Sequence, residues 1–437
     1  MHFRGTMRIN DLGHLEIGGC DVVTLAREFG TPLYIFDEEL IRSNCRKFYR
    51  AFVQTYGRAE VIYAGKAFLT LALCRIIYQE GLGLDVVSGG ELYTALQSGF
   101  PPERIYFHGN NKSWEELRLA LDAGIGRIIV DNFMELEALA RLARERRKRV
   151  PILLRVTPGI EAHTHEYIKT GQIDSKFGFT LPNGQALAAV KRVKEIPWLE
   201  YKGLHCHIGS QIFEVEPYAH AAEIMMAFIE EVQEEAGLVT EELDLGGGFG
   251  ITYVEGDNPR PIEHYAEAIM ACVYDEAEKR GLKVPKVIVE PGRAIIGPAG
   301  STAYTVGSIK EIPGIRKYVA VDGGMADNIR PALYGARYEA ILANKATAPA
   351  AEVVSITGKC CESGDMLIWD IALPEVEPGD ILVTPCTGAY GYSMASNYNR
   401  LGRPAGVLVK DGQADLILRR ETYEDLVRYD VLPARLK

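Results

Sequence analysis

Short runs of apolar, β-branched residues alternate along the chain with longer segments whose apolar residues recur every three or four positions. Runs such as "KVIVEPG" predict buried strands, and segments such as "NFMELEALARLARERRKR" have the spacing of an amphipathic helix. Eight predicted strands, with helical patterns between them, span 60–68, 83–88, 104–109, 127–132, 151–156, 201–209, 242–248 and 286–292.

Strand–helix alternation of this kind predicts parallel strands joined by right-handed crossovers. Eight such units favour a (β/α)8 TIM-like barrel, an α/β fold, and a doubly wound open sheet is the alternative. An earlier run, "PLYIFD" at 32–37, is expected only to lead into the barrel.

The helical pattern stops after about residue 298, and strand patterns follow. They include a predicted hairpin at 407–418, where alternating residues flank an Asp-Gly turn. We therefore predict a second, all-β domain, a β-sandwich or barrel. The predicted division is an N-terminal segment, 1–34, that contributes to the β-domain through "HLEIGG", a barrel at 35–298, and the β-domain at 299–437.

Composition places the chain among ordinary globular proteins, with 47% hydrophobic and 24% charged residues in 437. The net charge of −11 argues against nucleic acid or an anionic membrane as the main partner. The sequence has no apolar run of about 20 residues, and "MHFRGTMRIN" does not resemble a signal peptide. Eight cysteines without a CxxC pair predict reduced thiols and a cytoplasmic location.

Polar residues interrupt the predicted strands near their carboxyl ends, where the active sites of (β/α)8 barrels lie. Each of them alone is ordinary, because a lysine at a strand end usually reaches solvent and a triple glycine is usually a tight turn. Their shared placement predicts one site. The residues are Lys66, Asp85, His207, Ser210, Gly246, Gly247, Gly248, Glu290 and Arg293.

Lys66 lies in "VIYAGKAF", an apolar run in which a lone ammonium would be costly to bury. A lysine that forms an imine avoids that cost. We expect the N–H groups of "LGGGFG" to be bare and to form a nest for a phosphate, with Ser210 and Arg293 beside it. Glu290 could pair with a ring nitrogen. Pyridoxal 5′-phosphate (PLP) meets all of these requirements.

A metal site is the competing interpretation of the "HCH" motif, because His205 and His207 would share one face of a strand. Such a site needs further ligands from other strands, and the sequence shows no matching set. The "HTHE" segment at 163–166 lies in a predicted long loop. We therefore expect His207 to lie against a cofactor ring, and a merely packed histidine is the other alternative.

Several motifs together resemble the diaminopimelate decarboxylases, which are PLP enzymes related to alanine racemase and ornithine decarboxylase. The likeness runs from "IGGCDVVTLAREFGTPLYIFDE" nearly to the C-terminus in the family's order. It implies a barrel of the alanine racemase type, a C-terminal β-domain, and a homodimer with shared active sites. The motifs are "YAGKAF", "GLDVVSGGEL", "HGNNKS", "SKFGF", "GLHCHIGSQ", "LDLGGGFG", "VEPGRAI", "RPALY", "CCESGD" and "TGAYGYSMASNYN".

By this resemblance Lys66 is the Schiff-base lysine, His207 stacks on the cofactor and Glu290 pairs with the pyridine nitrogen. Tyr390 touches cofactor and substrate, and Arg293 reaches both the phosphate region and the substrate. The implied cofactor-binding set is Lys66, Asp85, His207, Ser210, Gly246, Gly247, Gly248, Glu290, Gly292, Arg293 and Tyr390.

The resemblance also implies a substrate site for the far end of a diamino acid. Arg330 and Tyr334, in "IRPALY", match residues that bind this end, and Glu362 matches the acid that binds its ammonium. Cys361 matches a catalytic cysteine contributed by the neighbouring subunit. The family more often has Gly-Pro-x-Cys-Glu-Ser where this chain has "GKCCES", so Cys360 is the alternative thiol.

The implied reaction converts meso-2,6-diaminoheptanedioate (diaminopimelate) to L-lysine and CO2, the last step of lysine biosynthesis. An acid at the ring nitrogen favours decarboxylation over racemisation, because a protonated ring accepts more of the developing charge. The alternatives are decarboxylation of ornithine, arginine or carboxynorspermidine on the same fold, and a catalytically silent binding protein. Silent relatives tend to lose the lysine or the cysteine, and both are present here.

Overall fold

The computed structural model describes residues 3–159 and 174–436, so "HTHE" at 163–166 lies outside the described residues. The chain divides into two compact units. The first, here the barrel unit, is Arg42–Ile251 with Asn258–Ile295. The second, here the β-unit, is Met1–Ile41, Thr252–Asp257 and Ile296–Lys437.

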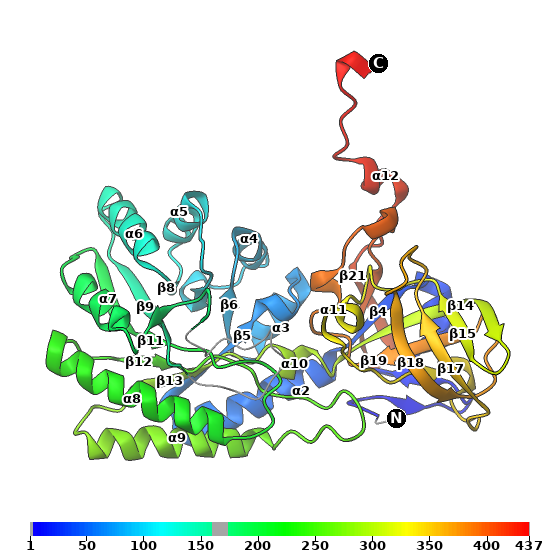
Figure 1. Cartoon of the computed structure of the whole chain (residues 1–437), viewed down its shortest axis with the longest axis horizontal. Coiled ribbons are helices and arrows are strands. Elements are labelled where there is room, and N and C mark those ends of the chain that lie inside the picture. The colour runs from blue at the N-terminus through cyan, green and yellow to red at the C-terminus, as the bar shows by residue number, and fades with distance from the viewer. Residues whose placement is uncertain (1–2, 160–173, 437) are drawn as a thin grey trace. The chain divides into compact units, whose positions relative to one another are not determined.

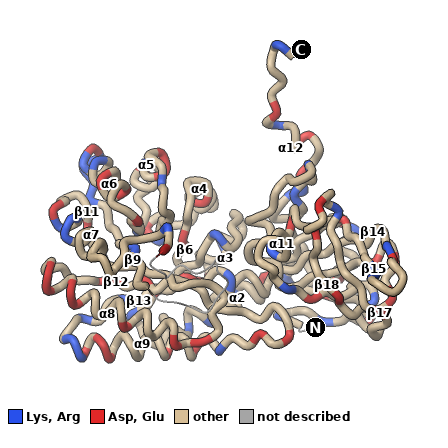
Figure 2. The backbone as a smooth tube through the Cα atoms, in the orientation of Figure 1, with Lys and Arg blue, Asp and Glu red and all other residues tan. Residues whose placement is uncertain are grey.

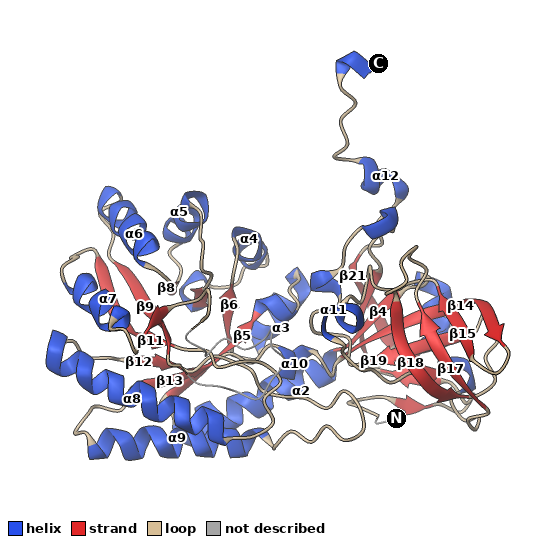
Figure 3. Ribbon diagram, in the orientation of Figure 1, coloured by secondary structure: helices blue, strands red, loops and turns tan. Residues whose placement is uncertain are grey.

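The barrel unit contains eight parallel strands in a closed sheet (Figures 1 and 3). The order is β5-β6-β7-β8-β9-β11-β12-β13, and β13 pairs with β5. All eight predicted strands and the barrel are thereby confirmed, and the open sheet is excluded. The strands are β5 (Ala59–Ala64), β6 (Gly83–Val86), β7 (Ile105–Phe107), β8 (Arg127–Val130), β9 (Val150–Thr157), β11 (Leu199–His205), β12 (Glu242–Asp244) and β13 (Lys286–Val289), with β10 (Phe179–Thr180) beside β9.

Helices alternate with these strands, and several begin at side-chain caps. Ser113 and Glu116 form a capping box, and Asn132 accepts the Glu135 N–H at the start of the helix that "NFMELEALARLARERRKR" predicted. The helical segments are α2 (Glu38–Phe48), η1 (Tyr49–Gln54), η2 (Gly65–Ala67), α3 (Leu71–Gln79), α4 (Gly89–Gln97), η3 (Pro102–Arg104), α5 (Trp114–Ala123), α6 (Phe133–Glu145), α7 (Gln185–Lys194), α8 (Glu216–Ala236), α9 (Ile262–Lys279) and α10 (Arg293–Ile296).

The β-unit is built on a larger sheet with the order β18-β17-β15-β14-β4-β20-β21. The β20–β21 hairpin turns at Asp411-Gly412 as predicted. Strand β18 has no counterpart among the predictions. The strands are β4 (Leu33–Asp37), β14 (Gly300–Ile312), β15 (Arg316–Val321), β16 (Ile341–Leu342), β17 (Glu352–Thr357), β18 (Met366–Leu373), β19 (Ile381–Pro385), β20 (Ala405–Lys410) and β21 (Gln413–Leu418).

Two N-terminal runs have different partners from those expected. "PLYIFD" does not lead into the barrel sheet: β4 lies between β14, antiparallel, and β20, parallel. "HLEIGG" forms β2 in a separate three-stranded sheet, although Leu15 and Ile17 pack into the same core as Leu33 and Ile35. That small sheet comprises β1 (Arg8–Ile9), β2 (Leu15–Ile17) and β3 (Cys20–Asp21), followed by α1 (Val22–Phe29).

The β-unit also contains short helical segments in its loops. They are α11 (Arg330–Tyr334), η5 (Ala343–Lys345), η6 (Tyr392–Met394), η7 (Tyr398–Arg400), α12 (Tyr423–Val427) and η8 (Ala434–Leu436). The helices of the barrel unit carry acidic and basic residues (Figure 2). Within the part of the chain that the structure describes, no helix combines the length and apolar character needed to cross a membrane.

Candidate active site

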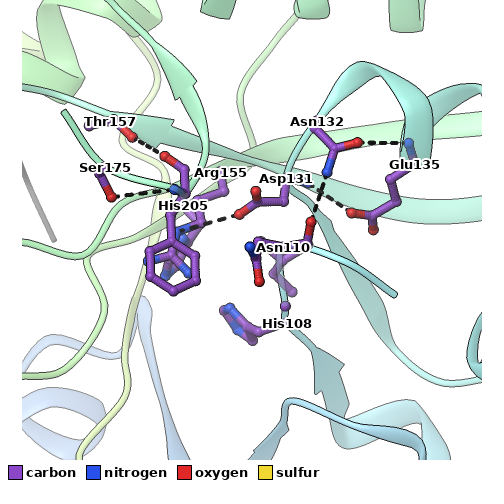
Figure 4. Close-up of polar contacts among 12 residues, drawn as sticks. His108, Asn110, Asp131, Asn132, Glu135, Arg155, Thr157, Ser175 and His205 are labelled. Carbon is purple, nitrogen blue, oxygen red and sulfur yellow. Dashed lines mark hydrogen bonds and ion pairs between the residues drawn. The ribbon is translucent and has the colours of Figure 1, made fainter. Parts of the chain in front are cut away.

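The carboxyl ends of the eight barrel strands each bring a charged or polar side chain to the same end of the barrel. His205 and Asp244 are the last residues of β11 and β12, and His108 and Glu290 directly follow β7 and β13. Figure 4 shows His108, Asp131, Arg155 and His205 directed toward a common region. The full ring, in strand order, is Lys66, Asp85, His108, Asp131, Arg155, His205, Asp244 and Glu290.

Glu290 lies at the centre of this group and is 3% exposed. Its Oε1 lies 2.8 Å from His108 Nε2, and its Oε2 lies 3.6 Å from His205 Nε2. The two imidazole rings meet edge to face, 4.8 Å apart. Burial alone would raise the pKa of Glu290, but His108 and His205 hold it well below its usual value. Glu290 is therefore a carboxylate near neutral pH.

Two further carboxyl groups of the ring are fully buried and have the opposite shift. Burial, together with the charge of Glu290, raises the pKa of Asp244 well above its usual value. Burial raises the pKa of Asp85 as well. The pKa of His205 falls to about 3, mainly because of burial, so this ring is neutral and can still donate one N–H. Negative charge is thus concentrated at Glu290.

Lys66 differs from the prediction in its surroundings. It lies in the 3₁₀ turn after β5, with its side chain 40% exposed, and its Nζ is 3.8 Å from Asp85 Oδ2. The expected cost of a lone buried ammonium is therefore wrong. The apolar residues around Lys66 belong to the strand before it and to the turn itself. They do not cover its amine. A partly accessible amine can react with a carbonyl compound that enters the barrel mouth.

The glycine loop also differs from the predicted nest. Gly246 N–H donates to Asp244 Oδ1 at 2.8 Å, and Gly247 N–H donates to His207 Nδ1 at 3.2 Å, so these two groups are not bare. A Cβ at Gly247 would lie 2.2 Å from the Glu290 carbonyl oxygen, so these glycines permit close packing. Gly248 N–H has no recorded partner within residues 3–159 and 174–436.

Ser210 and Arg293 lie together, as the sequence predicted for an anion site. Arg293 Nη2 donates to Ser210 Oγ at 2.9 Å, and Arg293 is buried at the start of α10. Gly292 packs closely, since a Cβ there would lie 3.0 Å from the Cβ of Ala64. A buried guanidinium beside a hydroxyl is suited to a phosphate.

His207 lies two residues beyond the end of β11, so it does not share a strand face with His205 as predicted. Its Nδ1 accepts the Gly247 N–H, which leaves the ring proton on Nε2. Burial, followed by the positive charges of Lys66 and Arg155, lowers its pKa well below the usual value. A neutral ring in a fixed orientation is suited to stacking.

The ring of side chains fits a polar cofactor. Both Asp85 carboxylate oxygens, Glu290 Oε1 and both ring nitrogens of His205 are buried without a hydrogen bond of good geometry in the described residues. Buried polar atoms of this kind require partners. A pyridine ring nitrogen would supply one to Glu290, and Lys66 supplies the amine for an aldehyde.

The structure does bring together one set of metal-ligand types, contrary to the sequence expectation. His108, His205, Asp244 and Glu290 have ligand atoms within 4.8 Å of one another, and His207 is not among them. The 2.8 Å separation of His108 and Glu290 is a hydrogen-bond distance, however. Two ligands on one tetrahedral zinc ion would stand about 3.3 Å apart. The group is thus better explained as a network around Glu290.

The predicted distal substrate residues lie in the β-unit. Arg330 begins α11, is 8% exposed, donates to the Tyr338 hydroxyl at 2.7 Å and lies 4.9 Å from the centre of the Tyr253 ring. Tyr334 ends the same helix and is half-buried. Two tyrosines thus hold Arg330 in place.

The "CCESGD" loop separates its two thiols. Cys360 is buried, and burial followed by Asp365 raises its pKa to about 11. Cys361 and Glu362 are exposed, and the Cys361 N–H donates to Asn399 Oδ1 at 2.7 Å. Tyr390 has a φ of 58°, a left-handed conformation that is uncommon outside glycine and often found at functional sites.

Sequence reasoning missed several side chains of these groups. His108, Asp131, Arg155 and Asp244 belong to the barrel ring, and Tyr338 orients Arg330. Position would have found His108, Asp131 and Arg155, because each lies next to the last residue of a predicted strand, whereas Asp244 lies in the first half of the predicted strand 242–248. Tyr338 carries no such signal, since it follows a helix by four residues.

Comparison with known proteins shows which family the chain belongs to. The profile of a protein family described as "Pyridoxal-dependent decarboxylase, pyridoxal binding domain" matches residues 40–297, the greater part of the chain. The chain belongs to the pyridoxal-dependent decarboxylase family. The fold, the enzyme class and the PLP cofactor predicted from the sequence are therefore confirmed.

Full-length relatives of this decarboxylase family extend the match. Diaminopimelate decarboxylase from Bacillus subtilis is 55% identical over 431 residues, covering 99% of this chain and 98% of the relative. The Synechocystis enzyme of the same name is 51% identical over 440 residues, with 99% and 93% covered. The resemblance to diaminopimelate decarboxylases is thereby confirmed.

A solved structure of the same group matches nearly the whole chain. Diaminopimelate decarboxylase from M. jannaschii, in complex with L-lysine, has a TM-score of 0.93 and 38% identity, with 99% of each chain covered. A lysine/ornithine decarboxylase from Vibrio vulnificus has a TM-score of 0.76 at 24% identity, with 89% of this chain and 97% of that chain covered, so it supports the fold alone.

Proposed function

We propose that this protein decarboxylates meso-2,6-diaminoheptanedioate to L-lysine and CO2 with PLP as cofactor. The observation that carries the chemistry is Glu290, a buried carboxylate held in its charged form between two histidines at the barrel mouth. Two relatives that match almost the full chain are named diaminopimelate decarboxylase. The reaction would complete lysine biosynthesis.

In the barrel unit, Lys66 would hold the cofactor through its aldehyde carbon, and Glu290 would pair with its pyridine nitrogen. His207 lies against the ring, and Asp85 lies beside Lys66. Ser210, Arg293 and the glycine loop would hold the phosphate, with the Gly248 N–H as one backbone donor. When bound, PLP supplies an electron sink for the pair of electrons left at the α-carbon as CO2 departs.

Glu290 acts because charge develops on the pyridine ring during the reaction. Its carboxylate would stabilise a proton on the ring nitrogen, and the stabilisation would be larger in the transition state than in the ground state. His108 and His205 favour the charged form of Glu290, while burial and the charge of Glu290 raise the pKa of Asp244 beside it. An acid at this position favours decarboxylation over racemisation.

The distal end of the substrate binds to residues of the β-unit in this proposal. Diaminopimelate has a carboxylate and an ammonium at that end, whereas ornithine and arginine have no distal carboxylate. Arg330 offers a guanidinium of fixed orientation to the carboxylate, Tyr334 lines the site, and Glu362 binds the ammonium. Tyr390 touches cofactor and substrate. This pair of charges is the reason for preferring diaminopimelate.

Cys361 delivers a proton from Sγ to the carbon that has lost CO2. Cys361 is exposed and next to Glu362. Cys360 is buried away from solvent, and this burial raises its pKa. We expect Cys361→Ser to slow lysine formation by about 100-fold, the usual scale of one proton-transfer group. Cys360→Ser should leave the rate within a few-fold of wild type. Steady-state assays of both variants decide which thiol acts, and equal losses would contradict the assignment.

The active assembly is a homodimer in which Cys361 serves the neighbouring subunit's site, and the enzyme acts in the cytoplasm. Both statements extend the resemblance to the decarboxylase family. Sedimentation of the purified chain tests the first: a monomer with full activity would contradict it.

Borohydride reduction of the yellow holoenzyme, followed by peptide mapping, tests the cofactor site. The label is expected on Lys66 alone, and labelling of another lysine would overturn the assignment. Purified protein should then be offered diaminopimelate, ornithine, arginine and carboxynorspermidine separately, with CO2 and product identity as readouts. Turnover of ornithine in preference to diaminopimelate would favour the alternative basic amino acid decarboxylase, and no turnover with PLP bound would favour the silent homologue.

A further inference from the structure

Gln211 has an unusual backbone for a residue with a side chain. Its φ is 60°, a left-handed conformation that costs such residues roughly 1–3 kcal/mol unless the surroundings enforce it. Its side-chain amide makes two hydrogen bonds to one residue: Nε2 donates to the Ile251 carbonyl at 2.7 Å, and Oε1 accepts the Ile251 N–H at 3.2 Å. A strained residue with a two-point contact suggests a function.

The Gln211 amide joins two segments that run side by side, 209–213 and 246–251. Ile212 N–H donates to the Gly248 carbonyl at 2.9 Å, and Gly250 N–H donates to the Ile212 carbonyl at 3.0 Å. The approach is close, because a Cβ at Gly248 would lie 2.4 Å from the Gly209 carbonyl oxygen. The first segment contains Ser210 and the second is the glycine loop.

Two buried tyrosines hold the same segments at other points. Tyr218 donates to the Gly247 carbonyl at 3.1 Å, and Tyr265 donates to the Phe213 carbonyl at 2.7 Å. Neither of these hydrogen bonds reaches Ile251. The Gln211 amide therefore secures the end of the glycine loop that these hydroxyl groups leave unsupported.

We propose that Gln211 is a positioning residue for the phosphate group of the cofactor. Gln211 follows Ser210 directly, and its amide binds the Ile251 backbone at the end of the glycine loop. This contact keeps the Ser210 hydroxyl and the Gly248 N–H close to each other and to Arg293. The amide itself does not touch the phosphate. This inference rests on the proposed function, in which Ser210, Gly248 and Arg293 hold that phosphate.

The test compares the affinities of full-length apoprotein for PLP and for pyridoxal, which lacks the phosphate, by absorbance titration. Gln211→Met keeps the side-chain size and removes both hydrogen bonds. We expect it to weaken PLP binding about tenfold, the effect of losing one to two net hydrogen bonds, and to leave pyridoxal binding within twofold. A merely structural role would change both affinities together or neither.

Asn344 provides a matched control in the β-unit. Its amide also makes a two-point contact, donating to Asp380 Oδ1 at 2.7 Å and accepting the Ile381 N–H at 3.0 Å. Asn344→Leu should leave the ratio of PLP to pyridoxal affinity unchanged. An equal change of that ratio in Asn344→Leu and Gln211→Met would overturn the inference.

A second variant decides the question if Gln211→Met does not fold. Gln211→Gly relaxes the left-handed backbone and still removes the amide, so it is expected to fold and to lose the preference for PLP. A wild-type ratio in Gln211→Gly would overturn the role of Gln211. If wild-type protein itself binds pyridoxal as tightly as PLP, the proposed phosphate site fails instead, whatever the variants do.

Discussion

Arg330 shows how a single side chain in this protein is prepared for a charged ligand. Its guanidinium is 8% exposed, yet within residues 3–159 and 174–436 its partners are the Tyr338 hydroxyl and the face of Tyr253. Neither partner neutralises the positive charge. A buried, oriented and uncompensated cation gains most from binding a carboxylate.

Replacing Arg330 with methionine keeps the apolar stem and removes the charge. We expect kcat/KM for diaminopimelate to fall about 10- to 100-fold, the effect of one charge-assisted hydrogen bond, with the cofactor absorbance intact. Arg316 is a suitable control, because it also packs on an aromatic ring, Trp369 at 4.9 Å, and Arg316→Met should retain activity. Unchanged kinetics in Arg330→Met would show that the distal pocket is misplaced.

Glu91 provides a pH prediction at the same scale. Its carboxylate accepts the Val87 N–H at 2.8 Å, and burial, with a contribution from Asp85, raises its pKa from 4.5 to about 7. The folded chain thus retains a proton that the unfolded chain releases between about pH 4.5 and pH 7. Stability contributed by this group is therefore lost as the pH rises through that window.

Glu91→Gln stays neutral and can still accept the Val87 N–H. We expect its free energy of unfolding in urea to fall less than that of wild type between pH 5 and pH 8, by as much as about 3 kcal/mol. Burial raises the pKa of Glu116, but N–H bonds from Ser113 and Gly89 lower it overall. A carboxyl group with a lowered pKa is ionised in both the folded and the unfolded chain above pH 5, so Glu116→Gln should leave the pH dependence between pH 5 and pH 8 unchanged. A parallel pH profile for wild type and Glu91→Gln would contradict the shift.

At the scale of elements, the two ends of the barrel strands have different chemistry. At the amino ends, Arg127 makes two hydrogen bonds of 2.7 Å to Glu242, and Lys286 lies 2.6 Å from Glu60. These four side chains are paired with opposite charges, and they close this end of the barrel. At the carboxyl ends, several buried polar atoms of the described residues make no hydrogen bond of good geometry, and this difference marks the functional end.

Strand β11 reaches its place only because residue 203 is a glycine. Its register against β9 shifts between Tyr201 and Gly203, and a Cβ at 203 would lie 1.8 Å from the Glu242 carbonyl oxygen. Gly203→Ala should push β11 away from β12 and destabilise the chain by about 3 kcal/mol or more. Gly307 in β14 is the control, since its nearest atom would be 3.6 Å away. Equal thermal midpoints for the two variants would refute this account.

At the scale of the whole molecule, the chain closes the β-unit with residues that are far apart in sequence. β4, at residues 33–37, pairs with β14 and β20, whose residues lie beyond position 300. All five β4 residues are buried. Until the last third of the chain is present, β4 is an apolar strand with two open edges, a known risk for aggregation.

A pair of fragments tests this dependence. A fragment of residues 1–295 contains β4 without β14 and β20, whereas a fragment of residues 42–295 lacks β4. We expect the longer fragment to aggregate more, as measured by light scattering at equal concentration, because its unpaired strand associates with other copies. Equal scattering from both fragments would show that β4 does not depend on its late partners.

Much of the fold and part of the site could be predicted, because periodicity is a local property. The eight barrel strands and the Asp411-Gly412 hairpin follow from the spacing of apolar residues and one turn. Parallel strands end at one rim, so Lys66, Asp85 and Glu290 could be grouped from the sequence alone. Strand β18, Met366–Leu373, was missed.

What the sequence determined by itself is therefore the kinds and order of elements and the rim at which polar residues gather. Tertiary structure alone decided that His108 and His205 flank Glu290, that Gly246 and Gly247 donate their N–H groups within the protein, and that β4 joins the β-unit. The physical reason is the same in each case. Hydrogen-bond partners and burial depend on which distant segments of the chain come into contact. The spacing of apolar residues along the chain does not determine those contacts.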